Sequence, residues 1–142
     1  MIIKYNPNSH YIELLGFVLD NSSLEFYYTE NNERKFIKDD ISLKALLKSS
    51  NSIYVDENNG GISGIILLWE ARGGDKVREY VKFLVSSEPV LSNLLKTFSY
   101  TSDKDLYIKV KKDSKYLQTF KNNNFQFKNG RGNEVLLMYK KD

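Results

Sequence analysis

The middle of the chain constrains the fold most, because three strand-like runs follow one another with turn residues between them. The runs are Ser52 to Asp56, Ile62 to Trp69 and Glu79 to Val85. Asn59-Gly60-Gly61 separates the first two and favours the positive φ of a hairpin turn, and Gly73-Gly74-Asp75 separates the last two. This order predicts a three-stranded antiparallel meander.

The pattern of apolar residues predicts how these strands are buried. Ile62 to Trp69 is apolar at nearly every position, which is typical of a strand buried on both faces. Glu79 to Val85 alternates, because side chains of a strand point to opposite faces in turn. One face then carries Glu79, Val81, Phe83 and Val85, and the other carries Tyr80, Lys82 and Leu84.

The residues before the meander predict a short strand from Met1 to Tyr5 and two helices. The first helix begins near Pro7, and the second begins at Asp39 or Asp40, whose carboxylates suit a helix N-terminus. Apolar residues recur at helical spacing in both, at Tyr11, Leu14, Leu15 and Val18 and at Ile41, Leu43, Leu46 and Leu47. Residues 26–38, between the helices, show no clear period.

The residues after the meander predict a helix, a strand, a short helix and a hairpin. Ser86 or Ser87 is a suitable N-cap for the first helix, and Leu106 to Val110 is the next strand. A strand, a helix and a strand in succession imply a parallel crossover. Asp113 or Ser114 caps the short helix, and Phe125 to Lys128 and Glu134 to Tyr139 form the hairpin over residues 129–133.

These elements predict an α+β fold in a single domain over residues 1–142, with a mixed, mostly antiparallel sheet flanked by helices. Cysteine is absent, which excludes disulfides, thiolate metal sites and cysteine nucleophiles. The one histidine is His10, so a histidine metal cluster is also excluded. We expect His10 to be an exposed or capping residue at the start of the first helix, and we expect no metal site.

The longest apolar run, Ile65 to Trp69, is far shorter than the roughly 20 residues of a membrane span. The first residues do not read as a secretory signal, so we expect a cytoplasmic protein that does not enter a membrane. The net charge of +3 is uneven, with +6 on residues 104–142 and −3 on residues 1–103. The basic part indicates either a solvated surface of lysines or an anionic partner such as a phosphorylated cofactor or nucleic acid.

The segment from Asp113 to Phe125 resembles a pattern of the GCN5-related N-acetyltransferase (GNAT) superfamily, N-x-x-A-I-x-L-Y-x-x-x-G-F. It reads Asp113-Ser114-Lys115-Tyr116-Leu117-Gln118-Thr119-Phe120-Lys121-Asn122-Asn123-Asn124-Phe125 here. The strand before it and the meander also look like those of the family. The resemblance covers residues 52–140 best and implies a GNAT-like three-layer fold that transfers an acyl group from acetyl-CoA to an amine of a small molecule or a protein.

The resemblance also implies roles for individual residues. The cofactor would lie against the backbone of Phe83, Leu84 and Val85, with Ser86 and Ser87 near its pyrophosphate. Glu79 corresponds to a general base that takes a proton from the amine, and a carboxylate on a partly buried strand suits that role. Glu79 could instead be a strand-end carboxylate paired across the hairpin with Arg72, Lys76 or Arg78. Tyr116 could replace the family's tyrosine acid, or it could simply pack.

Three departures separate this sequence from the family pattern. The glycine-rich turn that holds pyrophosphate is replaced by Ser86-Ser87-Glu88-Pro89, which has no glycine, adds a negative charge and removes one N–H donor. The tyrosine acid is replaced by Phe120, which has no proton to give. The glycine before Phe125 is replaced by Asn124, which can also adopt a left-handed conformation.

Three functions therefore stay open. The first is an N-acyltransferase with a divergent acetyl-CoA site, and the second is a non-catalytic protein that binds a ligand or protein on a GNAT-like fold. The third is a nucleic-acid-associated protein that uses the lysines near Asp113, namely Lys109, Lys111, Lys112 and Lys115, with Tyr107 and Tyr116. Neither the acceptor nor the oligomeric state follows from the sequence.

Overall fold

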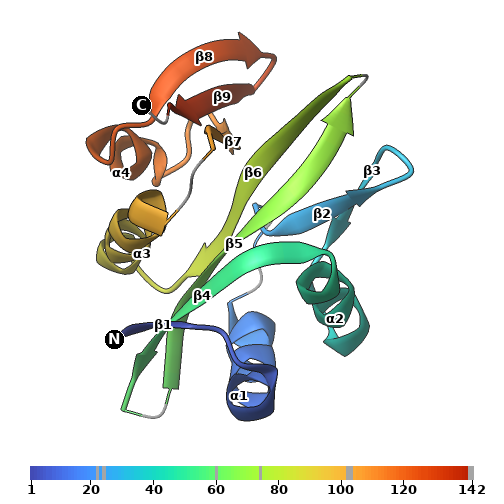
Figure 1. Ribbon diagram of the computed structural model, residues 1–142, viewed down its shortest axis with the longest axis vertical. Helices are drawn as coiled ribbons and strands as arrows, with labels where there is room; N and C mark the ends of the chain where they lie inside the picture. The colour runs from blue at the N-terminus through green and yellow to red at the C-terminus, as the bar shows by residue number, and fades with distance from the viewer. Residues whose placement is uncertain (22, 24, 60, 74, 102–103, 141–142) are drawn as a thin grey trace.

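A mixed sheet forms the centre of the molecule in the computed structural model, which describes residues 1–21, 23, 25–59, 61–73, 75–101 and 104–140 (Figure 1). Among these residues seven strands form the sheet, in the order β1-β4-β5-β6-β7-β9-β8. Their bounds are Ile2–Lys4 (β1), Ser50–Asn58 (β4), Gly61–Gly73 (β5), Lys76–Val85 (β6), Leu106–Lys111 (β7), Glu134–Tyr139 (β9) and Gln126–Arg131 (β8). Every neighbouring pair is antiparallel except β6 and β7, which are parallel.

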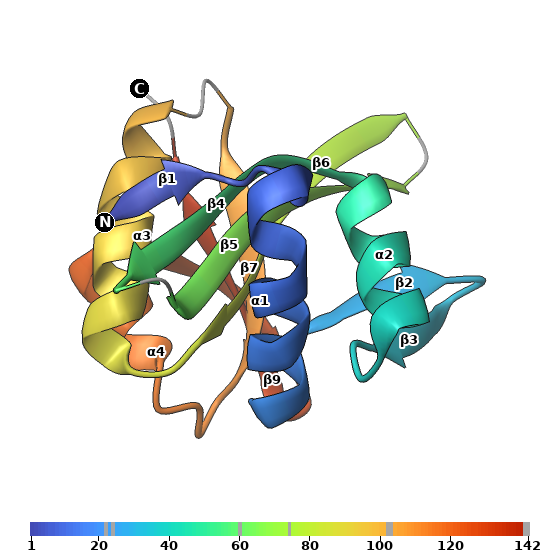
Figure 2. The same ribbon diagram turned by 90° about the horizontal axis from the view of Figure 1, so that it is seen from below.

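Helices cover both faces of this sheet, so the molecule has three layers (Figure 2). Helices α1 (Pro7–Asp20) and α2 (Asp40–Lys48) pack on one face, over a core that includes Val55, Ile65 and Leu84. Helices α3 (Glu88–Thr101) and α4 (Leu117–Asn122) pack on the other face. The predicted meander, parallel crossover and α+β class are confirmed, and Leu84 and Phe83 lie on the opposite faces expected from their alternation.

Local signals in the sequence explain where the first helices begin. The side chain of Asn6 accepts a hydrogen bond from the backbone N–H of Asn8, with Pro7 in the first turn of α1. Asp39 accepts from the N–H of Ser42, whose side chain in turn accepts from the N–H of Asp39, and this capping box starts α2.

The expectation that His10 is an exposed or a capping residue is confirmed for capping. Its side chain caps α1, because Nδ1 accepts the backbone N–H of Asn6 at 2.8 Å. It is buried rather than exposed, since Nε2 lies 3.2 Å from Oε2 of Glu57 on β4 and the ring packs beside Tyr5. A polar group with partners on both nitrogens can be buried without a large penalty.

The segment that showed no clear period forms a second, two-stranded sheet of β2 (Tyr27–Glu30) and β3 (Glu33–Phe36). Its turn consists of Asn31 and Asn32, both with positive φ (52° and 64°), a conformation that asparagine tolerates better than most residues. The strands are four residues long and mostly polar, so they lack the alternation that identifies a longer strand.

Two boundaries near the C-terminus differ from the prediction. Helix α4 starts at Leu117 rather than after Asp113 or Ser114, because the Ser114 hydroxyl and carbonyl accept the N–H groups of Tyr116 and Leu117 in a turn. Strand β8 extends through Arg131, which pairs with Glu134, so residues 129–131 belong to the strand and not to the turn. The predicted turns at Asn59-Gly60-Gly61 and Gly73-Gly74-Asp75 include Gly60 and Gly74, which lie outside the described residues.

Candidate functional site

The parallel pair β6 and β7 creates the main opening in the sheet. Only Glu79↔Leu106 and Tyr80↔Tyr107 pair between these strands, as far as the described residues show. Beyond Tyr80, β6 continues to Val85 while β7 continues to Lys111, paired only with β9 on its other side. The two strands therefore separate toward their C-terminal ends.

A cavity of about 570 Å³ occupies the space where the strands separate. We call it the β6–β7 gap. Its lining comes from the end of β6 (Phe83, Leu84, Val85, Ser86), from the end of β7 and the turn after it (Lys111, Asp113, Ser114, Lys115, Tyr116), and from the segment after α1 (Asn21, Ser23, Glu25). The structure thus brings Tyr116 together with four of the five predicted cofactor-binding residues. Ser87 is not part of this lining.

The edge of β6 that faces the gap has free backbone groups. In an antiparallel pair, successive residues direct their N–H and C=O groups alternately toward the partner strand and away from it. Since β5 pairs with Val81 to Val85 on one side and no described strand pairs with them on the other, alternate groups face the gap. Such groups require a partner, and an extended ligand with amide groups can supply one.

Aromatic side chains form the wall of the gap toward α4. The ring of Phe83 contacts Tyr116 and Phe120 edge-on, with centroids 5.2 and 5.4 Å apart. Phe120 is fully buried and also contacts Phe125, so it serves the core. Asn124 adopts a φ of 71°, which confirms the left-handed conformation predicted at that position. Tyr116 is partly buried and is the hydroxyl-bearing ring at this wall.

The turn that would face a pyrophosphate leads from β6 into α3. Ser87 stands directly before α3, and its carbonyl accepts the N–H of Leu91 at 3.3 Å, as expected for an N-cap. Ser86 and Glu88 are exposed, and the N–H of Ser86 donates to the carbonyl of Ser63. The serine hydroxyls and the backbone N–H groups of Ser87 and Glu88, at the start of α3, are the donors that this turn offers.

Charged side chains surround the outer part of the gap. Lys111 and Lys115 line it, and ammonium groups are suitable partners for phosphates. Glu25 also lines it, and Ser114 donates to both of its carboxylate oxygens at 3.3 and 3.4 Å. Burial raises the pKa of Glu25, which favours its uncharged form. The gap therefore combines a strand edge with unpaired backbone groups and two lysines in its lining.

Glu79 lies away from this lining. It stands at the closed end of the gap, where β6 and β7 still pair, and on the opposite face of β6 from Tyr80 and Lys82. Its carboxylate forms an ion pair with Lys104 at 3.3 Å, and only 12 % of its side chain is exposed. The ion pair matches the alternative interpretation of Glu79 as a paired strand-end carboxylate, but its partner is Lys104 and not the predicted Arg72, Lys76 or Arg78.

Sequence reasoning gave no role to Lys82, which the structure makes conspicuous. Lys82 lies on the α1 and α2 face of β6, is only 7 % exposed, and holds Nζ 3.8 Å from the ring centroid of Tyr27. The available signal was its position as a lone charged residue between apolar neighbours, Val81 and Phe83, on a central strand.

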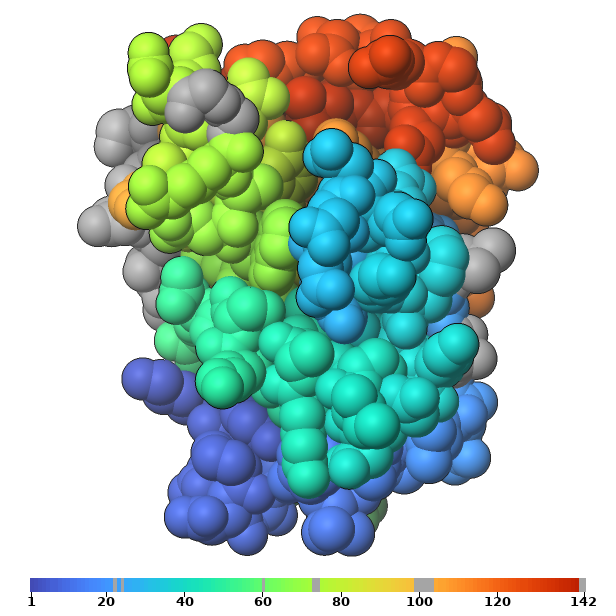
Figure 3. Space-filling model, turned by 90° about the vertical axis from the view of Figure 1, so that its right-hand side faces the viewer, coloured from blue at the N-terminus to red at the C-terminus, as the bar shows by residue number. Residues whose placement is uncertain are grey.

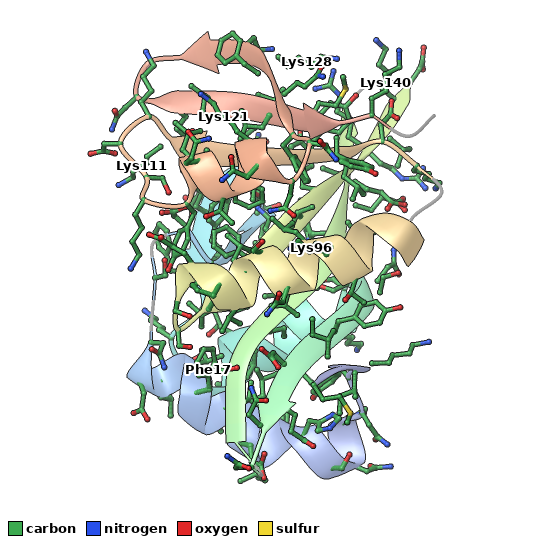
Figure 4. All side chains as sticks on the ribbon, turned by 90° about the vertical axis from the view of Figure 1, so that its left-hand side faces the viewer. Phe17, Lys96, Lys111, Lys121, Lys128 and Lys140 are labelled. Atoms are coloured by element: carbon green, nitrogen blue, oxygen red, sulfur yellow. The ribbon has the colours of Figure 1, made fainter. Side chains whose placement is uncertain are left out.

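The lysines proposed as a nucleic-acid surface lie on β7 and on the segment that follows it. Lys111 and Lys115 line the gap, and Lys109 lies on the same face of β7 as Lys111, near the ring of Tyr80. Figure 4 shows further lysines distributed over different elements, with Lys96 on α3, Lys121 on α4 and Lys128 on β8. Nucleic-acid binding therefore stays a prediction. No helix of the described part of the chain is long and apolar enough to cross a membrane.

The sheet order, the parallel pair that separates into a gap and the helices on both faces are those of the GNAT acetyltransferase fold, which confirms the predicted architecture. The sequence itself matches no protein-family model and no curated protein. The likeness is thus one of structure.

Three solved structures illustrate this likeness. The GNAT domain of PAT from S. lividans has a TM-score of 0.73 at 13 % identity, over 98 % of this chain and 89 % of that one. A GNAT-family acetyltransferase from Streptococcus pneumoniae has a TM-score of 0.63 at 15 % identity, over 97 % and 96 %. The N-acetyltransferase PseH from Campylobacter jejuni, solved in complex with acetyl coenzyme A, has a TM-score of 0.53 at 17 % identity, over 70 % and 75 %.

Proposed function

We propose that this protein is an acyl-CoA-dependent N-acyltransferase, with acetyl-CoA as donor and an amine of a small molecule or a protein as acceptor. The observation that carries the proposal is the β6–β7 gap, an open cavity beside a strand edge with unpaired backbone groups, in a fold shared with GNAT acetyltransferases. A gap filled by side chains would have favoured a protein without catalysis on the same fold.

Residues of the gap are assigned to parts of the donor. The backbone of Phe83, Leu84 and Val85 would bind the pantetheine arm, and the hydroxyls of Ser86 and Ser87 would lie near the pyrophosphate. Lys111 and Lys115 supply positive charge at the same end of the cavity. When bound, acetyl-CoA supplies an acetyl group activated as a thioester.

Two residues are proposed to move protons. Tyr116 would donate a proton toward the leaving sulfur, which is supported by its position in the gap lining beside Phe83. Glu79 would accept a proton from the amine, and a carboxylate kept largely from solvent is a reasonable base. Its ion pair with Lys104 would have to rearrange or relay the proton for this role.

A second candidate is a binding protein without catalysis on the same fold. The specific observation in its favour is Phe120, a fully buried ring at the position of the family's tyrosine acid. This candidate predicts that acetyl-CoA or another ligand occupies the gap and leaves chemically unchanged.

Calorimetric titration with acetyl-CoA tests the binding step. We expect wild type to bind, and Ser86→Trp to lose binding because an indole placed on the lining blocks the gap. Ser9→Trp, on an exposed position of α1, is the matched control and should bind like wild type. Absence of heat with wild type at millimolar acetyl-CoA contradicts the proposal.

Thiol release in the presence of an amine tests the chemistry. Tyr116→Phe keeps the ring that packs on Phe83 and removes only the hydroxyl. We expect its kcat to fall by about 10²-fold or more with unchanged acetyl-CoA affinity, since general acid–base groups contribute roughly 10²–10⁴-fold. Glu79→Gln should lower the rate at neutral pH and shift its pH profile. Binding without any acetyl transfer would favour the second candidate.

A further inference from the structure

A second hollow lies on the α1 and α2 side of the sheet, where three hairpins meet. The hairpins are β2–β3, β5–β6 and β8–β9, which converge on the face shown in Figure 3. Two adjoining cavities of about 290 and 440 Å³ lie there and share Tyr80 and Lys109 in their linings. We call this region the hairpin groove.

The hairpin groove carries an excess of positive charge. Its lining includes five cationic side chains, Arg72, Arg78, Lys82, Lys109 and Arg131, and two carboxylates, Glu70 and Glu134. Glu134 accepts a hydrogen bond from Nη2 of Arg34 at 2.6 Å, and Glu70 lies 3.7 Å from Arg72. Within the described part of the chain, the other four cations of the lining form no ion pair.

Lys82 is the cation for which this excess matters most. More than nine-tenths of the residue is buried, and Nζ lies 3.8 and 5.8 Å from the rings of Tyr27 and Trp69. No described residue forms a hydrogen bond or an ion pair with it. Burial, and then the positive charges of Arg34 and Lys109, lower the pKa of Lys82 to about 7. The rings of Tyr27 and Trp69 and the charge of Glu134 therefore replace the directly bonded counterion that a buried ammonium normally has.

We propose that the hairpin groove binds an anionic group, a carboxylate or a phosphate, of a small amine that is the acyl acceptor; this inference rests on the proposed acyl transfer. An anion between Lys82 and Lys109 would supply the missing counterion. The two cavities of the groove, about 290 and 440 Å³, together fall within the range of small-molecule sites, about 300–1,000 Å³. A small acceptor therefore suits it better than a folded partner.

The position of the groove suits an acceptor site. Lys82 lines the groove, and Leu84, which lies on the same face of β6, lines the β6–β7 gap, so the two spaces are neighbours along one strand. An acceptor anchored in the groove would present its amine where the strands begin to separate. The surrounding cations would also disfavour an ammonium, so they would favour the uncharged amine that attacks a thioester carbonyl.

Calorimetry at fixed ionic strength with three amines of similar size tests the inference. The amines are phosphoethanolamine, β-alanine and ethanolamine, which carry a phosphate, a carboxylate and no anion. We expect at least one of the anionic amines to bind at least tenfold more tightly than ethanolamine. Whichever of the two binds tells whether the groove is suited to a phosphate or to a carboxylate.

Three variants show whether binding occurs in the groove. Lys109→Ala and Lys82→Met should each weaken binding of that amine at least tenfold, and circular dichroism establishes that each variant is folded. Lys121→Ala, on an exposed position of α4, is the matched control and should bind like wild type. Equal binding of all three amines, or equal affinities in the Lys109 and Lys121 variants, overturns the inference.

Acetyl-CoA binding to the same wild-type preparation separates this inference from the proposed function. If anionic amines bind in the groove and acetyl-CoA does not bind, acyl transfer fails and the anion site stands. If acetyl-CoA binds and thiol is released equally fast with ethanolamine and with the anionic amines, acyl transfer stands and the anionic acceptor is wrong.

Discussion

Lys82 makes the stability of this protein depend on pH in a way that no exposed lysine does. Burial, assisted by Arg34 and Lys109, lowers its pKa from 10.5 to about 7 in the folded chain. Between pH 7 and 10.5, the unfolded chain binds one more proton at this site than the folded chain. The free energy of unfolding therefore rises with pH over this window, and below pH 7 the penalty of burying the ammonium is fully present.

The first prediction is that Lys82→Met is more stable than wild type at pH 6. Methionine keeps much of the volume and the contact with Tyr27 without a charge to bury. Because each pH unit changes the linkage free energy by about 1.4 kcal/mol, the advantage should shrink by up to about 2.5 kcal/mol between pH 7 and 9. Urea unfolding of both proteins at pH 6, 7 and 9 measures this change.

Lys121→Met is the control for the lysine prediction, because Lys121 is an exposed lysine of α4 whose charge is not among the causes of the lowered pKa of Lys82. The difference between this variant and wild type should stay nearly constant over the same pH range. A constant difference between Lys82→Met and wild type would show that the folded protein holds Lys82 with an ordinary pKa.

At the same scale, the sequence identified one side of the candidate site and missed the other. Phe83 to Ser86 and Tyr116 were found because the family pattern places them, and they do line one cavity. Lys82 was missed because a strand's alternation says which residues share a face but not what covers that face. Its burial depends on Tyr27 of β2, from the segment whose structure the sequence did not reveal.

Among the elements, the contact between α3 and β5 depends on a missing side chain. A Cβ added to Gly64 would lie 2.7 Å from Cγ1 of Val90 and 3.0 Å from Cγ1 of Val85. Valine is stiff at its branch point, so it has little freedom to give way. The first turn of α3, at Val90, thus packs closely against β5, directly after the proposed pyrophosphate turn.

The second prediction is that Gly64→Ala lowers the free energy of unfolding by about 1–3 kcal/mol, the usual range for overpacking a core. Chemical denaturation monitored by Trp69 fluorescence measures this loss. Gly16→Ala is the matched control, since a Cβ at Gly16 meets nothing within 4 Å and alanine favours a helix, so it should be neutral or stabilising. A Gly64→Ala protein as stable as wild type would show that α3 can move away from β5 at no measurable cost.

The elements show why most of this fold can be predicted from sequence and where prediction stops. The meander and the crossover follow from long periodic runs with glycine turns, and both are present. The β2–β3 hairpin was not predicted because its strands are short and polar and its turn uses Asn31 and Asn32 in place of glycine. The predicted start of α4 was wrong because the Ser114 hydroxyl accepts a local hydrogen bond from the N–H of Tyr116, which competes with a helical turn.

Over the whole molecule, the N-terminal and C-terminal thirds of the chain meet at the β2–β3 hairpin. Arg34 of β3 donates to Oε1 of Glu134 of β9 at 2.6 Å, across 100 residues of sequence. The hydrogen bond from Arg34 lowers the pKa of Glu134. Since both side chains are 30–40 % exposed, solvent screens the pair, and its coupling should be only about 0.5–1 kcal/mol.

The third prediction is that this pair holds the hairpin against the sheet without contributing much to global stability. Arg34→Ala should speed amide hydrogen exchange in β2 and β3 by about three- to fivefold, the factor that corresponds to the expected coupling, and leave exchange in α3 and β5 unchanged.

A double-mutant cycle with Glu134→Gln measures the coupling free energy between Arg34 and Glu134 itself. The pKa of Glu134 is lower in the folded protein than in the unfolded chain. The stabilisation is therefore present above the ordinary carboxyl pKa of about 4.3, and it is lost as the pH falls through the pKa of Glu134 in the folded protein. The cycle should therefore give a favourable coupling at pH 7 that disappears near pH 3. Faster exchange throughout the molecule, or a coupling that survives at pH 3, would contradict a local, charge-based attachment of the hairpin.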